Sequence, residues 1–191
     1  NIQNLSSNKG NIIDGVFIIK PTIFEDHRGF FYESWNQPLF NKLIGEEVRF
    51  QQDNHSLSNI GVLRGLHYQI GANPQVKLVR CSSGSIFDVA VDIRKSSPTF
   101  GEWTSIVLSG LNKLMIWIPV GFAHGFLSLE DNSQVLYKTS ELWSKDKERS
   151  IRWNDKKINI NWPLKDINFS YPRLSEKDLK APILKNSDVF K

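Results

Sequence analysis

The stretch GVLRGLHYQ, residues 61–69, has the apolar content of a buried strand but also contains Arg64 and His67. Strict alternation of side chains along a strand would place these two groups on opposite faces. Gly65 lies between them, and a glycine inside a strand is a common position for a bulge that changes the phase of alternation. Two interpretations are open. With a bulge, both groups point into the molecule; without one, His67 is a hydrogen-bonded core residue and Arg64 faces outward.

Similar short apolar segments recur along the chain about every ten residues, separated by turns rich in glycine, proline, asparagine and serine. This pattern predicts an all-β protein, either a β-sandwich or a jelly-roll barrel, with a few short helices. The expected strands are residues 15–20, 29–35, 48–53, 61–69, 76–82, 85–93, 103–109, 114–119, 124–130 and 133–140, and the expected helices are 37–45 and 175–184. The polar segment after residue 140, which holds Trp143, Trp153 and Trp162, is expected to wrap irregularly over the barrel.

Length, charge and cysteine content limit the class of protein. With 191 residues and a net charge of +4, the chain fits one globular domain over residues 1–191. The single cysteine, Cys81, excludes an internal disulfide and a zinc site made of several cysteines. No long apolar run and no secretory signal are seen, so we expect a cytoplasmic protein without membrane contact. The lysines of the C-terminal third could form a nucleic-acid tail or a solvated face, and the lack of long like-charge blocks favours the solvated face.

Lys77 is the second unexpected charge in a predicted core strand. Alternation places it on the same face as Val79 and Cys81, where an ammonium group is unfavourable unless its charge is used or paired. The alternative is that Lys77 lies at the strand end and extends its charge to solvent. On the following strand, Asp88 could neutralise Lys77 or orient a histidine, whereas Asp92, near the strand end, is expected at the surface.

A second histidine lies in a similar setting in IPVGFAHGF, residues 118–126, where His124 comes after a turn and stands within an apolar run. The Gly61 to His67 spacing and the later Pro119-x-Gly121-x-x-His124 resemble the two half-motifs of the cupin superfamily. Metal-binding cupins carry His-x-His and a nearby glutamate in the first half. Here His67 is followed by tyrosine and glutamine, so we expect no metal and a His67 that is free to act as a base.

Longer strings carry a more specific resemblance. DHRGFFYESWNQ (26–37), QQDNHSLSNIGVLRGLHYQ (51–69), VKLVRCSSGSIFDVAVDIRKSSPTFGEW (76–103), WIPVGFAHGFL (117–127), LYKTS (136–140) and IRWND (151–155) resemble the dTDP-4-dehydrorhamnose 3,5-epimerase family. This resemblance implies a homodimeric, cupin-type jelly-roll enzyme of deoxysugar biosynthesis that needs no cofactor. Such an enzyme epimerises C3 and C5 of a nucleotide-linked 4-keto-6-deoxyhexose, converting dTDP-4-dehydro-6-deoxyglucose to dTDP-4-dehydro-L-rhamnose.

The resemblance also implies roles for individual residues. His67 would be the general base, Asp178 its orienting carboxylate, Lys77 the group that stabilises the enolate, and Tyr137 the acid on the opposite face. Further site residues are implied as follows: His124 and Asp88 support the reaction, Arg28 and Arg64 bind the diphosphate, Phe31, Glu33, Gln52 and Asn54 form the nucleotide and sugar pocket, and Trp143 lies near the base. Arg28, Phe31 and Glu33 would reach in from the neighbouring subunit.

These residue types suit the chemistry. A proton next to a ketone is weakly acidic, and histidine has a pKa near neutrality for removing it. A buried cation can stabilise the oxyanion that forms, and tyrosine can donate a proton on the other face. Three alternatives stay open: a 3-only or 5-only epimerase or one for another nucleotide-linked 4-keto sugar, a metal-dependent cupin oxygenase or isomerase, and a non-catalytic sugar-binding cupin.

Overall fold

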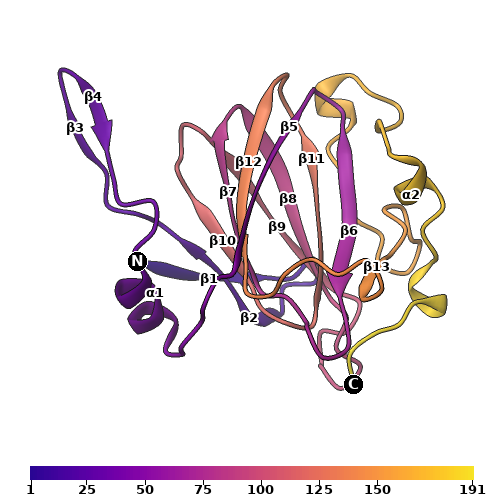
Figure 1. The fold of residues 1–191 in the computed structure, drawn as a ribbon. Coiled ribbons are helices and arrows are strands. Elements are labelled where there is room, and N and C mark those ends of the chain that lie inside the picture. Colours follow the sequence, from indigo (N-terminus) through magenta and orange to yellow (C-terminus); the bar gives the residue numbers. More distant parts are fainter.

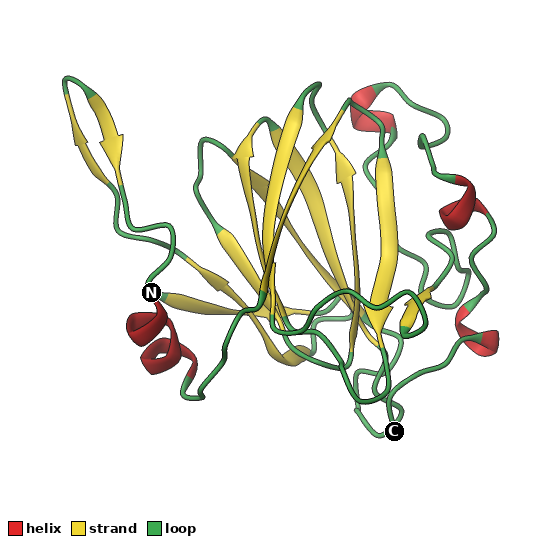
Figure 2. Cartoon of the chain, in the orientation of Figure 1, coloured by secondary structure: helices red, strands yellow, loops and turns green.

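Antiparallel strands dominate the computed structural model, which describes all 191 residues (Figure 2). The strands are β1 (Ile2–Ser6), β2 (Ile12–Ile19), β3 (Phe24–Asp26), β4 (Gly29–Phe31), β5 (Gln52–Ser58), β6 (Leu63–Gln69), β7 (Lys77–Ser83), β8 (Ser85–Asp92), β9 (Trp103–Ser109), β10 (Met115–Ile118), β11 (Phe122–Ser128), β12 (Ser133–Thr139) and β13 (Glu148–Ser150). The helices are α1 (Gln37–Ile44), α2 (Glu176–Leu179) and the 3₁₀ turns η1 (Lys165–Ile167) and η2 (Leu184–Asn186). None of these helices has the length and hydropathy needed to cross a bilayer.

Two sheets face each other and form the expected jelly-roll barrel (Figure 1). One has the strand order β1-β2-β10-β7-β12-β5 and the other β13-β6-β11-β8-β9. Val79, Ile86, Ile116 and Phe126 are among the buried residues that fill the space between the sheets. Their alternation with outward side chains is what the period of two in the sequence predicts.

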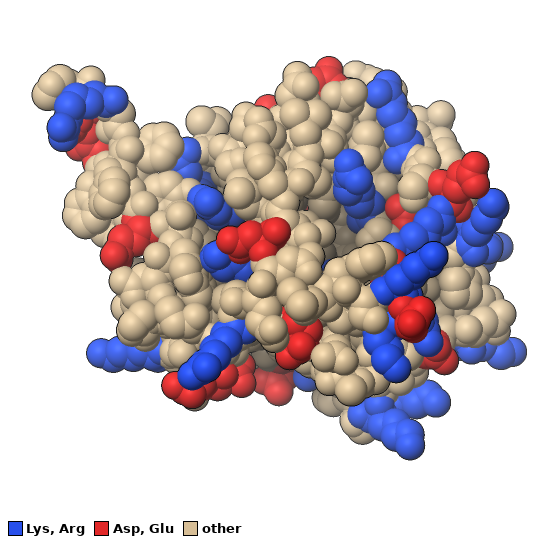
Figure 3. Space-filling model, in the orientation of Figure 1, with Lys and Arg blue, Asp and Glu red and all other residues tan.

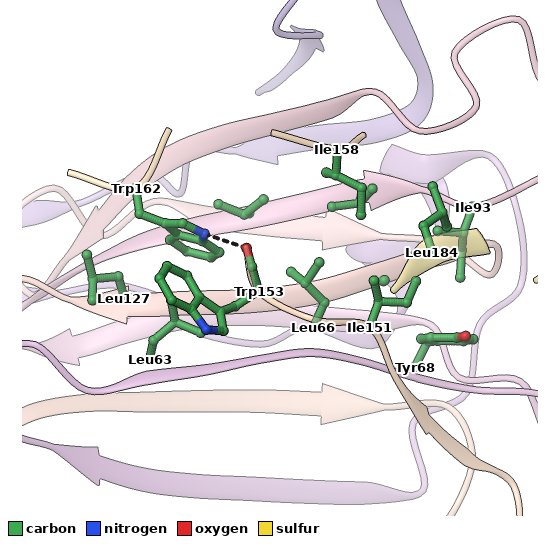
Figure 4. Packing of buried hydrophobic residues seen from close by; sticks show 13 residues of the cluster. Leu63, Leu66, Tyr68, Ile93, Leu127, Ile151, Trp153, Ile158, Trp162 and Leu184 are labelled. Carbon is green, nitrogen blue, oxygen red and sulfur yellow. Dashed lines mark hydrogen bonds between the residues drawn. The ribbon is translucent and has the colours of Figure 1, made fainter. Parts of the chain in front are cut away.

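The outer faces of both sheets are also covered, so the strands are apolar on both sides. Helix α1 packs Phe40 against Trp117 on the outer face of one sheet. The C-terminal segment (yellow in Figure 1) runs along the other sheet and buries Trp153 and Trp162 there. The indole Nε1 of Trp162 donates a hydrogen bond to the carbonyl of Trp153 at 2.9 Å (Figure 4). This covering fixes the C-terminal segment in place over β6.

Strand β6 contains the bulge that its sequence predicts. Against β11, His67 pairs with His124 and Arg64 pairs with Phe126, so two β6 residues lie opposite the single residue Gly125. A Cβ atom on Gly65 would lie 2.5 Å from the Cα of Gly125, and the φ of Gly65 is +138°. Only glycine fits this close approach of two backbones. The extra residue changes the phase of the strand, and the bulge interpretation is confirmed because Arg64 and His67 line the same cavity.

Several element boundaries differ from the expected ones. The strands β1, β3 and β13 were not predicted, and residues 29–35 form only the short β4. β5 spans Gln52–Ser58 rather than 48–53, because its polar residues pair with β12 although their composition is not typical of a strand. The expected helix at 175–184 is the single turn α2, since Pro182 prevents its continuation.

The prediction for Asp92 was wrong. Its side chain is fully buried and accepts hydrogen bonds from Arg94, Ser97 and Thr99. The residues after the strand fold back over the carboxylate, a turn contact that alternation alone does not reveal.

The β3–β4 hairpin projects from the barrel (Figure 1). Phe24, Phe30 and Phe31 are 62%, 55% and 68% exposed there. The hairpin rests on the body of the molecule through the ammonium of Lys113, which lies 3.9 Å from the ring centre of Phe30. Three exposed phenylalanines on one arm are unusual for a surface that faces only water.

Candidate active site

A cavity of about 470 Å³ opens between the two sheets and is lined by the chemically important side chains. Figure 3 shows this hollowed face of the molecule with basic side chains beside it. His67 of β6 and His124 of β11 enter from the five-stranded sheet, while Lys77 of β7 and Tyr137 of β12 enter from the six-stranded sheet. The two sheets therefore present different groups to opposite sides of whatever fills the cavity.

His67 and Asp178 form a tight pair at the wall of this cavity. Nε2 of His67 lies 2.6 Å from Oδ1 of Asp178, and the other carboxylate oxygen accepts a hydrogen bond from Ser175 at 2.9 Å. Ser175 also caps α2, which fixes Asp178 over a strand that lies far away in the sequence. Burial lowers the pKa of His67 below its ordinary value, and the Asp178 carboxylate offsets part of this effect. A neutral imidazole with one nitrogen held by a carboxylate is suited to accept a proton.

Lys77 is buried and does not reach solvent at the strand end, so the alternative interpretation was wrong. Its Nζ donates to the backbone carbonyl of His67 at 3.3 Å and otherwise faces the cavity. Burial lowers the pKa of Lys77 to about 8, while the charges of Asp88 and Glu148 act in the opposite direction. Near neutral pH this ammonium is charged and poorly solvated, so it can interact strongly with a developing negative charge.

A second histidine–carboxylate pair adjoins the same cavity, which His124 lines and from which Asp88 is set back. Nε2 of His124 is 2.9 Å from Oδ2 of Asp88, and Asp88 is fully buried. Oδ1 of Asp88 has no hydrogen-bond partner. Of the two tasks that the sequence left as alternatives, Asp88 therefore orients a histidine. It forms no ion pair with Lys77, although its charge raises the pKa of that lysine.

Tyr137 faces these groups from the opposite sheet. It pairs in register with Asn54 of β5 and Val79 of β7, which fixes its position along the barrel. Burial raises the pKa of its phenol, and the nearby Arg64 offsets part of this rise. The phenol is therefore protonated over the whole neutral range and can serve as a proton donor.

A smaller hollow of about 100 Å³ adjoins this group and is shared by His67, Lys77 and Tyr137. Gln52, Asn54 and Trp143 line it. Nε2 of Gln52 donates to Asn54 at 2.7 Å, and its Oε1 accepts from the backbone N–H of Trp143 at 2.9 Å. Gln52 and Asn54, which were expected at the nucleotide and sugar pocket, and Trp143, which was expected near the base, thus form one connected set beside His67.

The arginines and the hairpin residues separate into two groups. Arg64 lines the main cavity and is held by Ser58 and the carbonyl of Leu57, both at 3.1 Å. Arg28 lies on the projecting hairpin and pairs with Asp26 of the same hairpin. Phe31 lies on that hairpin, Glu33 follows it, and neither lines the cavity of its own chain.

One ion pair at the cavity was not predicted. Nζ of Lys177 lies 2.6 Å from Oε1 of Glu148, and both residues line the cavity. Burial would raise the pKa of Glu148, but Lys177 holds it below its ordinary value. The position of Lys177 next to Asp178 in the sequence could have indicated that Lys177 lies at the site. Glu148 lies in a polar segment that contains no such indication.

No group of three histidine, cysteine, aspartate or glutamate side chains is arranged to hold a metal ion. The two histidines of the cavity each bond to a single carboxylate instead. A histidine that is held by one carboxylate is arranged to accept and donate protons.

A family model described as dTDP-4-dehydrorhamnose 3,5-epimerase matches residues 11–186. The chain is 54% identical over 172 residues to a dTDP-4-dehydrorhamnose 3,5-epimerase of Salmonella typhimurium, covering 90% of this chain and 92% of the relative. The corresponding enzyme of Pseudomonas aeruginosa is 51% identical over 178 residues, with 93% of this chain and 96% of the relative covered.

Solved structures agree with this similarity. A dTDP-6-deoxy-D-glucose-3,5-epimerase from Legionella pneumophila, in complex with dTDP-4-keto-L-rhamnose, superimposes with a TM-score of 0.89 at 44% identity, covering 98% of this chain and 95% of the other. A 3′-monoepimerase from Streptomyces bikiniensis, in complex with dTDP-quinovose, gives 0.83 at 33% identity, covering 91% and 85%.

The carboxylate of Asp178 raises the pKa of His67, so replacing it by a neutral amide should lower that pKa further. We expect Asp178→Asn to shift the His67 titration to lower pH in an NMR experiment on the ring protons. Asp88→Asn, which changes the partner of His124 instead, should leave the His67 midpoint in place. An unchanged or raised midpoint in Asp178→Asn would show that the two groups are not coupled in solution.

Proposed function

Because the chain belongs to the dTDP-4-dehydrorhamnose 3,5-epimerase family, we propose that it is an isomerase that converts dTDP-4-dehydro-6-deoxyglucose to dTDP-4-dehydro-L-rhamnose. It inverts C3 and C5, the two carbons next to the C4 ketone. The proposed steps need only side chains as proton donors and acceptors and require no cofactor.

A single observation carries the proposed mechanism. His67 and Tyr137 project into one cavity from opposite sheets, with Lys77 beside them. A sugar ring held between the sheets would present one face to His67 and the other to Tyr137. Inversion of a carbon needs this arrangement, because the proton must leave on one face and return on the other.

In the first step His67 removes the proton from the carbon next to the ketone. The C–H electron pair forms the C=C bond of an enolate, and the carbonyl π electrons move to the C4 oxygen. Asp178 keeps a proton on Nε2 of His67, so Nδ1, which makes no hydrogen bond within the chain, is the basic nitrogen. The ammonium of Lys77 stabilises the enolate oxygen.

In the second step Tyr137 gives its phenolic proton to the same carbon from the opposite face, and the ketone reforms. The enzyme is left with a protonated His67 and a tyrosinate, so both must exchange protons with solvent before the second carbon reacts. Asp88 orients His124 at the cavity wall, and its charge favours the protonated form of Lys77.

The remaining site residues bind the nucleotide part of the substrate. Arg64 holds the diphosphate, since a guanidinium matches phosphate geometry better than an ammonium does. Gln52, Asn54 and Trp143 form the smaller hollow beside the base and accommodate the remaining nucleotide and sugar groups.

The hairpin completes the site of a second copy in a homodimer. Arg28, Phe31 and Glu33 do not line the cavity of their own chain, and the hairpin exposes three phenylalanines away from the barrel. An exposed apolar arm with an arginine at its tip is suited to insert into a partner's nucleotide site.

Residues 1–191 act as one domain, because both sheets and the C-terminal segment contribute side chains to the same cavity. We also place the enzyme in the cytoplasm, in agreement with its single, buried and unpaired Cys81.

A second candidate is epimerisation at only one carbon. It is favoured by the similarity to the Streptomyces bikiniensis 3′-monoepimerase, although at 33% this identity is well below the 54% to the Salmonella enzyme. NMR analysis of the product made from dTDP-4-dehydro-6-deoxyglucose separates the two, since only the 3,5-epimerase inverts both carbons.

The two-face mechanism predicts different failures for two variants. His67→Ala should lose both epimerisation and hydrogen exchange with deuterated water, by at least the ~10²–10⁴-fold typical of a positioned acid or base. Tyr137→Phe keeps the base and Lys77, so it should still incorporate deuterium while largely retaining the original configuration. Both are measured by NMR of the substrate in deuterated water.

Normal epimerisation by Tyr137→Phe would show that another group is the acid. Deuterium exchange near the wild-type rate in His67→Ala would show that the base has been misassigned.

The dimer proposal predicts complementation between subunits. Arg28→Ala and His67→Ala homodimers should both be impaired, because each lacks one part of every site. Mixed dimers combine an intact cavity of one chain with an intact hairpin of the other at one of their two sites. Random reassortment should therefore restore about a quarter of wild-type activity, as two-fold symmetry requires. Full activity of Arg28→Ala, or no recovery on mixing, would argue against a shared site.

A further inference from the structure

The main cavity has more positive charge than its own carboxylates neutralise. Glu148 pairs with Lys177, and Asp178 pairs with His67. The other cations that line the cavity, Arg64, Lys77 and Arg173, form no ion pair with any carboxylate of the chain. With Lys77 assigned to the ketone oxygen, two free guanidinium groups remain.

Arg173 is held in place by the start of β6. Its backbone N–H donates to the carbonyl of Gly61 at 2.7 Å, and its carbonyl accepts from Leu63 at 3.0 Å. This ladder joins the segment before α2 to the residues that lead into Arg64. Arg173, which lies more than a hundred residues from Arg64 in the sequence, is thereby fixed at the same wall of the cavity as Arg64.

The side chain of Arg173 also has a prepared support. Its guanidinium carbon lies 5.4 Å from the ring centre of Phe169. Phe169 in turn packs against Gly61, where a Cβ atom would lie 2.5 Å from Cε1 of the ring. Stacking on an aromatic ring restrains the guanidinium and leaves its N–H groups free at the ring edge.

Arg64 alone has limited capacity for a diphosphate. Its Nε and one terminal nitrogen are already bonded to Ser58 and to the carbonyl of Leu57. Two of its five N–H donors are therefore used, and one positive charge has to serve two phosphates, each of which is negatively charged. A second guanidinium from the same chain would add further donors and a second positive charge on the side of the diphosphate that the hairpin of the neighbouring subunit does not supply.

We propose that Arg173 is a second phosphate-binding residue, contributed by the same chain as His67, which holds the substrate's diphosphate together with Arg64. This inference rests on the proposed function for the identity of the ligand. It assigns Arg173 to binding and not to proton transfer. Its loss should therefore raise KM while leaving the chemical step in place.

The test measures the affinity of the full-length protein for dTDP by calorimetry. Arg173→Met should weaken dTDP binding about tenfold, the lower range for a hydrogen bond to a charged group. Lys165→Met removes one positive charge from an exposed residue that does not line the cavity, and it should bind dTDP like the wild type. The dTDP affinity of Arg173→Lys should lie between those of Arg173→Met and the wild type. An ammonium keeps the charge but cannot form the paired hydrogen bonds of a planar guanidinium.

Thymidine, which carries no phosphate, serves as the second probe and should bind equally to all four proteins. In the epimerase assay Arg173→Met should raise KM and keep kcat and deuterium exchange at saturating substrate within a few-fold of wild type. Wild-type dTDP affinity in Arg173→Met would overturn the proposal. So would an equal loss of thymidine binding, which would show that Arg173 only shapes the pocket.

The outcome is separable from that of the proposed function. A wild-type protein that binds dTDP through Arg173 but forms no epimer would refute the epimerase activity and leave the phosphate site intact. An active epimerase whose dTDP affinity is the same with and without Arg173 would refute the phosphate site and leave the epimerase activity intact.

Discussion

The contact between Gly65 of β6 and Gly125 of β11 is the constraint on which the site depends. It lets two backbones approach more closely than any side chain would permit, and it accommodates one extra residue in β6. Without that residue, normal alternation would turn either Arg64 or His67 out of the cavity. A local steric condition thus determines that a phosphate-binding group and a proton acceptor share one strand and one face.

The electrostatics of the cavity follow from burial. An ammonium and an imidazole that are withdrawn from water both have lowered pKa values, and each is restored in part by a nearby carboxylate. The result is a neutral base and a charged, weakly solvated Lys77 in the same pH range. Tyr137 is shifted in the other direction and stays protonated. Three groups with different proton affinities therefore surround one space, which is the arrangement that deprotonation and reprotonation require.

The sequence predicted an all-β fold, a β-sandwich or a jelly-roll barrel, because its short apolar segments and turn residues report local structure directly. The choice of the cupin-type barrel came from the family resemblance. The sequence also offered Arg64 and His67 on one face as one of two interpretations, since Gly65 was a visible signal for a bulge. It failed for the buried Asp92, because the turn that directly follows the strand folds over the carboxylate. It failed for the Glu148–Lys177 pair, because the two residues come from different segments of the chain. The pairing of Asp178 with His67 spans 111 residues and came only from the family resemblance. Contacts between distant segments carry no periodicity that a single sequence can reveal.

The central claim is that a charged Lys77 stabilises the enolate formed by His67. The most direct test is the pH dependence of kcat/KM for the wild type and for Lys77→Met. The wild-type rate should fall on the alkaline side with a pKa of about 8, as Lys77 loses its proton. Lys77→Met should be slower by about 10²–10³-fold, the usual effect of losing an oxyanion-stabilising group, and should lack this alkaline limb. A wild-type rate that stays constant well above this pKa, or a limb that persists in Lys77→Met, would contradict the account.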